Sequence, residues 1–445
     1  LHRRRHSFPT RRSSDLVNKI LIVIALLLVY RLGTFVPLPG INAIVLEHFV
    51  QNNSSGVLGM FNMFTGGALG RMSIFSLNIM PYITASIVMQ LLGIIYKDIG
   101  EMRKDGATGK RKLNQYTRYL ALALAVFQGF GLAAAAERMA VNGMNLVEQP
   151  GVLFRFVATL SMVGGTAFVI WLTDQISSRG VGNGSSLVIF SGIVAGLPTA
   201  MATLFDMGRS GALSPIMIIL IFAICIGLVM LIVFCERAFR KIPVNYPKRQ
   251  IGNRLYAGQS THLPLKINVS GVLAPIFASS LLLFPATIIN FIGQETLPDS
   301  WQYSVLMYLG HGKPLYIALY IALIVFFSFF YTSVVFNPDE TADNLKKAGA
   351  VVVGRRPGTQ TSDYLDSVLT KLTIIGATYL SFICVMPEIL IAHYSIPFYL
   401  GGTSLLIVIN VVIELFQQIQ THTLGKQYQN MLQKRKGSSL STIRR

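Results

Sequence analysis

The chain has 445 residues, of which 52% are hydrophobic and only 13% are charged, and its formal net charge is +19. A soluble domain carries nearly twice that share of charged residues, so the composition argues against an ordinary soluble enzyme. Apolar runs of about 20 residues recur along the chain, and this is the length that crosses a bilayer as a helix. The sequence therefore predicts an all-α polytopic membrane protein.

The first residues differ from the rest of the chain. The stretch His6–Leu16, HSFPTRRSSDL, resembles one reading frame of a common sequencing adapter. We interpret residues 1–16 as a non-native, adapter-derived segment and leave them out of the fold reasoning. A genuine basic cytoplasmic arm is the alternative.

Ten apolar runs follow that are long enough to span a membrane. They are approximately 18–36, 78–96, 116–136, 152–173, 184–205, 214–235, 268–293, 315–336, 368–392 and 397–418. A short link near 206–213 divides them into an N-terminal half, 17–205, and a C-terminal half, 206–421, before a basic tail, 422–445. Because each half has five spans, the second half enters the membrane from the opposite side. This predicts two pseudo-symmetric inverted halves.

The Lys and Arg residues of the loops predict the orientation. Loops 97–115, 174–183, 236–267 and 337–367 hold eighteen of them. The intervening loops hold three when the broken stretch 57–75 is left aside. Cytoplasmic loops are enriched in Lys and Arg, so both termini are expected to be cytoplasmic.

One stretch, Met60–Tyr82 (MFNMFTGGALGRMSIFSLNIMPY), interrupts the pattern. Gly66 and Gly67 weaken helix continuity, and Arg71 is costly against lipid. Pro81 suits an early position in a new helix. Irregular backbone at membrane depth is tolerated only where protein shields it or where it lines a water-filled cavity. The stretch is therefore a shielded, re-entrant element or, alternatively, a kinked helix.

Patterns for enzyme chemistry are absent from the sequence. The loop Gly180–Ser186 lacks the third glycine of a dinucleotide site, and Asp105–Lys112 is not a phosphate-binding loop. His262 has no partner ligands nearby in the sequence, and the three cysteines lack metal or redox spacing. We expect no catalytic residue, no metal site and no cofactor. No carboxylate is visible at mid-depth in a predicted span, which argues against an ion-coupled carrier.

Six longer motifs occur in order along the chain. They are YRLGTFVPLPGIN (Tyr30–Asn42), the stretch Met60–Tyr82, GVGNGSSLVIFSGIVAGLP (Gly180–Pro198), STHLPLKINVSGV (Ser260–Val272), FNPDETADNLKKAGAVVVGRRPG (Phe336–Gly358) and GGTSLLIV (Gly401–Val408). Together they resemble the SecY family, the central subunits of bacterial protein-translocation channels. The resemblance runs from about Val17 to the tail.

The resemblance implies a plug and a pore ring. Residues 57–75 would form a short re-entrant plug helix that seals the resting pore, and it would include Phe64, Gly66, Gly67 and Arg71. Six isoleucines would form a constriction: Ile79, Ile83, Ile189, Ile193, Ile276 and Ile407. Branched apolar side chains close around an extended polypeptide, yet they offer ions nothing to replace hydration. Taken singly, an isoleucine in a membrane helix more commonly faces lipid or the core.

The resemblance also implies a lateral gate between the second and third spans on one side and the seventh and eighth on the other. Thr84, Gln128 and Phe284 match positions along it. Hydroxyl and amide groups hold membrane helices together weakly, by roughly 0.5–2 kcal/mol each, which suits a gate that must open. For Gln128, ordinary helix–helix contact is an equal alternative.

The basic loops 236–267 and 337–367 would dock partners. Lys248, Arg249, Arg254, Arg355 and Arg356 are placed to engage a phosphate backbone or an acidic protein surface. The alternative is that these positive charges only determine the orientation of the chain in the membrane. This alternative explains why the loops are positively charged but not why they are long. Arg355 and Thr359 depart from the family pattern, which has an apolar residue and a carboxylate there.

The function that the resemblance implies is a protein-conducting channel without an enzymatic step. It would pass unfolded secretory polypeptides across the bacterial cytoplasmic membrane and release hydrophobic segments laterally into the lipid bilayer. Its expected partners are the small membrane subunits SecE and SecG, the SecA ATPase, the ribosome, signal sequences and nascent chains. From the residues alone, a secondary transporter of a small solute with inverted repeats stays open, and a membrane-embedded enzyme lacks its catalytic cluster.

Overall fold

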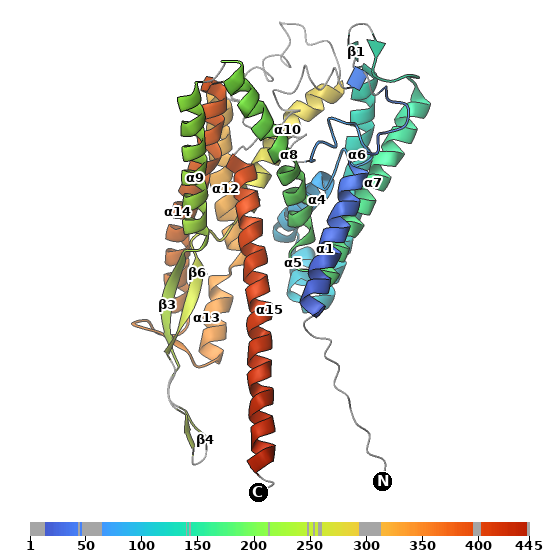
Figure 1. Cartoon of the computed structure of the whole chain (residues 1–445). Coiled ribbons are helices and arrows are strands. Elements are labelled where there is room, and N and C mark those ends of the chain that lie inside the picture. The colour runs from blue at the N-terminus through green and yellow to red at the C-terminus, as the bar shows by residue number, and fades with distance from the viewer. Residues whose placement is uncertain are drawn as a thin grey trace, which may run out of the picture. The chain divides into compact units, whose positions relative to one another are not determined.

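A computed structural model provides the structure of the chain (Figure 1). It describes residues 14–42, 45–46, 65–138, 140–141, 144–211, 214–246, 249–251, 254–256, 260–292, 313–394 and 402–442. Within these ranges it describes the backbone but not the side chains of several segments, chiefly 249–256, 283–292, 390–394 and 425–442.

The chain divides into two compact units. The first comprises Leu1–Gly196 and Val411–Arg445, and the second comprises Leu197–Asn410. The borders fall inside two helices, α8 (Gly184–Arg209) and α15 (Gly402–Thr442), so each of these helices contributes to both units. The division into halves at residues 205 and 206 stays a prediction.

The first unit is built around a bundle of long helices. Besides its parts of α8 and α15 it contains α1 (Ser14–Gly33), α4 (Met80–Ile95), α5 (Lys97–Lys104), α6 (Gly106–Arg138), β1 (Ala140–Val141), β2 (Met144–Asn145) and α7 (Val152–Arg179). Helices α6 and α7 lie side by side, and α4 packs against α6 (Figure 1). The strands β1 and β2 form a short antiparallel hairpin between α6 and α7.

An ion pair closes the connection between α6 and α7. Glu137 near the end of α6 accepts hydrogen bonds from the Arg155 Nε at 2.6 Å and from the backbone amide of Gly151 at 2.9 Å. The Glu137 side chain is almost fully buried, whereas Arg155 is partly exposed. A buried carboxylate is stable only when it is paired and hydrogen-bonded, and these contacts supply both.

The second unit combines membrane helices with a small sheet. It contains α9 (Pro215–Glu236), β3 (Phe239–Asn245), β4 (Arg249–Ile251), β5 (Arg254–Tyr256), β6 (Ser260–Lys266), α10 (Leu273–Ile292), α12 (Pro314–Val335), α13 (Pro338–Lys347), β7 (Val351–Val352) and α14 (Thr359–Tyr394). Helix α12 packs between α10 and α14, and α13 packs on α14.

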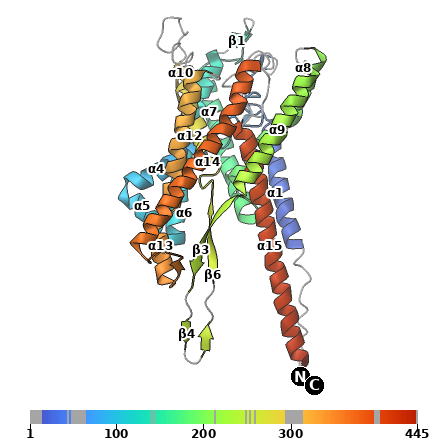
Figure 2. The same cartoon turned by 90° about the vertical axis from the view of Figure 1, so that its left-hand side faces the viewer.

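A long hairpin projects from the helices of the second unit (Figure 2). Its strands β3 and β6 pair antiparallel from Phe239 opposite Lys266 to Asn245 opposite Ser260, and β7 joins the other edge of β3. Ile242 and Val244 on one face pack against Leu365 and other residues of α14. The sequence predicted only loops in this region. The period-two pattern is short and only one face is buried, so hydropathy did not reveal the strands.

Eight helices in the described part of the chain are long and apolar enough to cross a membrane. Two shorter apolar helices, Met80–Gly93 and Leu273–Leu282, coincide with the predicted second and seventh spans. The predicted all-α polytopic class is therefore confirmed, whereas the count of ten spans stays a prediction.

Several helices extend well beyond the apolar runs that predicted them. Helix α6 begins at Gly106, ten residues before its run, and α14 begins at Thr359. Helix α15 continues to Thr442 through the predicted basic tail. A hydropathy pattern detects only the apolar part of a helix, so it does not predict polar turns that extend the helix beyond the hydrocarbon layer.

Two adjacent glycines of α7 occupy different surroundings. Gly165 is buried, and a Cβ added there would meet the carbonyl oxygen of Ile74 and lie 2.8 Å from its Cγ2. A Cβ added at Gly164 would meet nothing within 4 Å. Gly165 therefore lets the segment that contains Ile74 approach the α7 backbone.

The substitution Gly165→Ala should lower the free energy of unfolding by about 1–3 kcal/mol, because the neighbouring backbone must move away. Gly164→Ala is the matched control and should cause no loss. Thermal unfolding of the purified chain in detergent micelles, followed with a thiol-reactive dye, measures both. Equal melting temperatures for the two variants would contradict the close contact.

Candidate functional site

Four of the predicted ring isoleucines belong to the first unit, and all are buried. Ile79 immediately precedes α4, and Ile83 lies one turn further along that helix. Ile189 and Ile193 occupy the same i, i+4 relation on α8. Their exposed fractions are 9% or less, whereas Ile95 at the end of α4 is 73% exposed. These four side chains therefore pack inside the protein.

The other two ring positions belong to the second unit. Ile276 on α10 is 8% exposed, and Ile407 on α15 is 2% exposed. Both side chains are buried within the fold. The assembly of all six isoleucines into one ring stays a prediction, because they are divided between the two units.

The first described part of the broken stretch, residues 65–79, is a series of turns. Gly66 and Gly67 have positive φ angles of 67° and 86°, which residues with a Cβ rarely adopt. Met72 and Asn78 are also left-handed, with φ angles of 43° and 49°. The family resemblance predicted a short helix within residues 57–75. The described residues 65–75 contain no helix, and Phe64 lies outside the described residues.

Protein shields the backbone of these turns. The amide of Leu38 donates to the carbonyl of Met72 at 2.9 Å, and the amide of Ile74 donates to the carbonyl of Val36 at 3.0 Å. Ser76 donates its hydroxyl to the carbonyl of Ser73, and Ser76 itself is 2% exposed. The segment thus meets the condition for irregular backbone at membrane depth, which is that the protein satisfies its polar groups.

Helix α1 holds the beginning of this segment. Arg31 Nη1 donates to the carbonyl oxygen of Gly66 at 2.5 Å, and the hydroxyl of Tyr30 donates to the carbonyl of Thr65 at 3.4 Å. A Cβ at Gly66 would lie 2.9 Å from the Cα of Gly192 on α8 and 3.0 Å from Arg31 Nη1. Gly66 is therefore enclosed between α1 and α8.

Arg71 lies at the exposed side of the same segment. Its guanidinium carbon is 4.1 Å from the centroid of the Phe35 ring, and that of Arg31 is 5.2 Å from it. A cation stacked on an aromatic face gains electrostatic stabilisation while it keeps its contact with water. That Arg71 avoids lipid stays a prediction.

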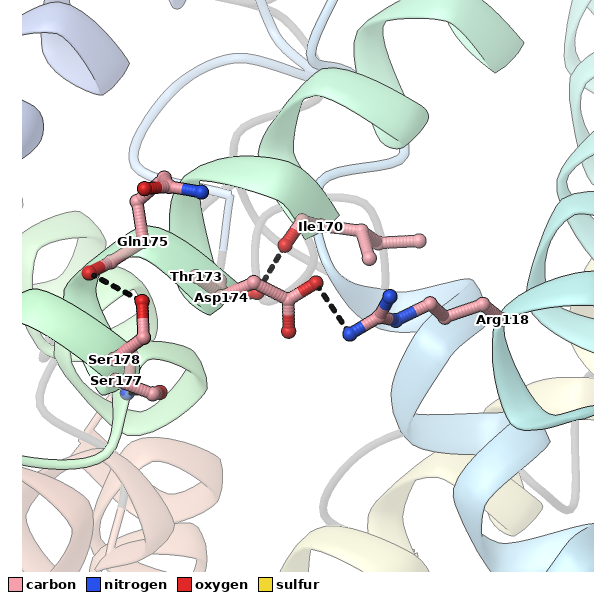
Figure 3. A network of polar contacts seen from close by, with 8 residues as sticks. Arg118, Ile170, Thr173, Asp174, Gln175, Ser177 and Ser178 are labelled. Atoms are coloured by element: carbon pink, nitrogen blue, oxygen red, sulfur yellow. Dashed lines mark hydrogen bonds and ion pairs between the residues drawn. The ribbon is translucent and has the colours of Figure 1, made fainter. Parts of the chain in front are cut away.

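Polar contacts fix the junction between α7 and α8, which precedes Ile189 and Ile193. Arg118 of α6 forms a 2.8 Å ion pair with Asp174, shown in Figure 3 together with the hydroxyl of Thr173, which donates to Ile170. The amide of Gly184 donates to Ser177 at 2.9 Å.

Helix α15 adds a further contact at this junction. The side chain of Gln418 accepts a hydrogen bond from the amide of Gly182 at 2.7 Å. Sequence reasoning missed these positioning residues. Opposite charges at the ends of neighbouring apolar runs were the available signal for Arg118 and Asp174.

The predicted gate residues are only partly described. Thr84 is half-buried, and its hydroxyl donates to the carbonyl of Met80 within α4 at 3.1 Å. Gln128 is half-buried on α6. Phe284 lies on α10, but its side chain is outside the described residues. Their roles in a lateral gate stay predictions.

The predicted docking residues occupy two places in the second unit. Arg249 and Arg254 lie on β4 and β5, opposite Tyr256 and Ile251. Arg355 and Arg356 are exposed between β7 and α14, while Lys248 lies outside the described residues.

The two exposed arginines differ in their contacts. The guanidinium carbon of Arg355 is 5.0 Å from the centroid of the Tyr364 ring. The carbonyl of Arg356 accepts a hydrogen bond from the Thr361 hydroxyl, and Arg356 as a whole is exposed.

The described residues contain no group of three or more His, Cys, Asp or Glu side chains that could hold a metal ion. All three cysteines, Cys225, Cys235 and Cys384, are free thiols. The described candidate residues fall into three kinds: buried isoleucines, hydrogen-bonded turns and exposed arginines.

Comparison with known proteins identifies the family. The family model described as SecY matches residues 73–416. The protein translocase subunit SecY of Rickettsia conorii is 52% identical over 431 residues, which cover 96% of this chain and 98% of that protein. The protein of the same name from Escherichia coli K12 is 50% identical over 421 residues, which cover 94% of each chain.

Solved structures share the fold at low sequence identity. "The structure of a protein conducting channel" matches with a TM-score of 0.66 and 18% identity, over 91% of this chain and 92% of that chain. "Sec61 in the Canine ribosome-channel complex from the endoplasmic reticulum" matches with a TM-score of 0.63 and 17% identity over the same shares. The expected family resemblance is thus confirmed along nearly the whole sequence, and the chain belongs to the SecY family.

Proposed function

We propose that this chain is the pore-forming subunit of a protein-translocation channel in the bacterial cytoplasmic membrane. It carries unfolded secretory polypeptides outward and releases hydrophobic segments laterally into the bilayer. The observation that carries the proposal is the identity of about half of all residues, over nearly the full length, to proteins named translocase subunit SecY. The long apolar helices support a multi-pass membrane protein. The Lys and Arg residues of the loops favour an orientation with both termini in the cytoplasm.

The six isoleucines form the constriction of the pore. Their burial separates them from isoleucines that only contact lipid, which would be exposed like Ile95. Their match to positions in the family supports a place in the ring instead of the helix core. An apolar ring gates ions by dewetting, while an extended polypeptide fills it and maintains the seal. Selection against ions therefore needs no charged filter.

Residues 57–75 form the plug, and its described part begins at Thr65 and includes Gly66, Gly67 and Arg71. Its glycines, its turns and its contact with Arg31 support a piece of chain that is held by protein instead of lipid. Displacing these residues breaks the hydrogen bond between Arg31 and Gly66 and the backbone hydrogen bonds to Val36 and Leu38, but it unwinds no described helix. The plug therefore opens by exchanging hydrogen bonds and not by unfolding a membrane helix.

The lateral gate opens between α4 and α6 on one side and α10 and α12 on the other. Thr84 already satisfies its hydroxyl within α4, so it need not bind a facing helix. A gate whose surfaces do not bond strongly to one another parts when a hydrophobic segment enters.

We infer that this chain performs no chemical step, so its partners must supply the free energy for translocation. Arg355, Arg356 and the β4–β5 tip form a basic surface for the SecA ATPase and for the RNA of the ribosome. Related channel structures are described in complexes with ribosomes, which supports the second partner. SecE and SecG are the expected small membrane subunits. The relatives do not favour the small-solute transporter.

Reconstitution tests the proposal directly. Vesicles that contain the chain with SecE, SecG, SecA and ATP should protect a labelled preprotein from added protease. Vesicles without the chain, or without ATP, should not. Protection that is independent of the chain, or none with every component present, would overturn the proposed function.

Polar substitution of the ring should let ions through. We expect the double variant Ile193→Asn and Ile407→Asn to raise the halide leak of resting vesicles about tenfold or more, because amides hydrate the constriction. Preprotein passage should persist. Ile375→Asn, at a 56% exposed position of α14, is the matched control and should not leak. A double variant as tight as the wild type would refute the ring.

Charge reversal at the docking surface should slow transport without unfolding the chain. Arg356→Glu should reduce SecA-driven translocation several-fold, roughly fivefold, since an exposed interface charge mainly alters the association rate. Arg209→Glu makes the same charge change at an exposed position on the opposite predicted face. Translocation rates at two salt concentrations, together with the amount of chain in the membrane, decide the outcome. If the amount of chain in the membrane falls as much as the translocation rate, Arg356 only helps to orient the chain and does not dock a partner.

A further inference from the structure

A buried polar contact joins the end of α9 to the approach to α10. Glu236 is the last residue of α9, and Asn268 follows β6; they are 6% and 4% exposed. The Asn268 Nδ2 donates to the Glu236 Oε1 at 2.7 Å. The two residues are 32 positions apart in the sequence, with the whole hairpin between them.

Asn268 also shapes the turn that leads into α10. Its Oδ1 accepts from the hydroxyl of Ser270 and from the amide of Gly271, both at 3.0 Å. Its Nδ2 donates to the carbonyl of Gly271 at 3.3 Å as well as to Glu236. Gly271 has a φ of 59°, and α10 begins two residues later. One amide therefore ties α9, the turn and the beginning of α10 together.

The contact continues the hydrogen-bonded ladder of the hairpin. Phe239 pairs with Lys266, and the amide of Ile267 donates to the carbonyl of Ala238 at 3.3 Å. The contact between Glu236 and Asn268 follows next and closes the base. The hairpin, the end of α9 and the beginning of α10 are thereby linked at one point.

A buried carboxylate–amide pair is an energetically costly way to join these two segments. Neither of the two ion pairs found among the described residues involves Glu236, and Lys266 acts on it only through a longer-range attraction. A buried carboxylate is costly unless it receives hydrogen bonds, whereas two apolar side chains would stabilise the same place as well. In some proteins, buried polar pairs of this kind fix one arrangement against alternatives.

The position of the beginning of α10, which this pair fixes, affects the position of Ile276. The amide of Ile276 donates to the carbonyl of Val272 in the first turn of α10, two turns of chain after Asn268. Phe277 packs edge-on against Phe327 of α12, with ring centroids 5.8 Å apart. A shift at the beginning of α10 therefore moves Ile276 relative to α12.

We propose that Glu236 and Asn268 are positioning residues of the channel: their hydrogen bond sets where α10 begins and thereby holds Ile276 in the constriction. The proposal rests on the proposed function, because it gives Ile276 its role in the pore. When the hydrogen bond is broken, α10 has more than one starting position, and the channel loses both its seal and its discrimination between preproteins.

Three variants test the pair by exchanging its chemistry. Asn268→Asp replaces the donor with a second carboxylate facing Glu236, so it should open the contact. Glu236→Gln keeps the acceptor oxygen and should behave like the wild type. The double variant Glu236→Gln and Asn268→Asp restores one donor and one acceptor with exchanged roles. Asn344→Asp, at an exposed position on α13, is the control for added negative charge.

The measurements use the full chain in vesicles with SecE, SecG, SecA and ATP. Two labelled preproteins are compared, one with an intact signal sequence and one with a defective signal sequence, and halide leak is recorded in the resting state. Asn268→Asp should pass the defective preprotein roughly tenfold faster than the wild type and should leak more halide. The double variant should return both values close to those of the wild type. Wild-type selectivity and leak in Asn268→Asp would overturn the proposal.

A second double variant keeps the test decisive if Asn268→Asp does not accumulate. Glu236→Gln with Asn268→Ser leaves no buried charge and keeps a short side chain that can cap the turn, but serine is too short to reach residue 236. It should fold and yet leak halide and accept the defective preprotein. If it folds and keeps wild-type selectivity, the pair has no positioning role. If the wild type does not pass the intact preprotein in the same vesicles, the proposed function itself has failed.

Discussion

Every backbone amide and carbonyl at membrane depth needs a hydrogen-bond partner, because lipid supplies none. Helices meet this demand within themselves, but residues 65–79 do not form one. Their amides and carbonyls instead bond to residues 36–38, to Arg31 and to one another. The chain can leave the helical state at this place only because the first unit surrounds it. This requirement explains why the segment is so rich in glycine and serine.

A second constraint explains the close approaches between backbones. Membrane helices gain little from burying apolar surface against one another, so contact depends on small residues that let main chains meet. Gly165 admits the carbonyl of Ile74, Gly184 faces the carbonyl of Thr173, and Gly402 faces the carbonyl of Ile383. The glycines that matter are thus spread along the sequence and share no motif. Each is defined by the segment that lies against it.

Much of the architecture could be read from the sequence. Hydropathy located the long helices to within a few residues wherever lipid defined their ends, and family motifs singled out isoleucines that prove to be buried. The hairpin β3–β6 was missed because its buried face is only a few residues long. The contact between Glu236 and Asn268 was missed for another reason: two ordinary polar side chains meet from positions that are 32 apart in the sequence. Pairings of that kind depend on the fold and leave no local pattern.

The proline at the beginning of α4 also limits how far that helix can reach. Pro81 lies in its first turn, where a missing amide is harmless, and from there α4 has 16 residues to Ile95. At about 1.5 Å per residue that is about 24 Å of rise, whereas the hydrocarbon layer is about 30 Å thick. The helix alone is thus too short to cross the layer along its normal. In the predicted second span the missing distance falls to the turns before α4. A stretch of chain without regular structure is then expected to be part of the wall that separates the two sides of the membrane.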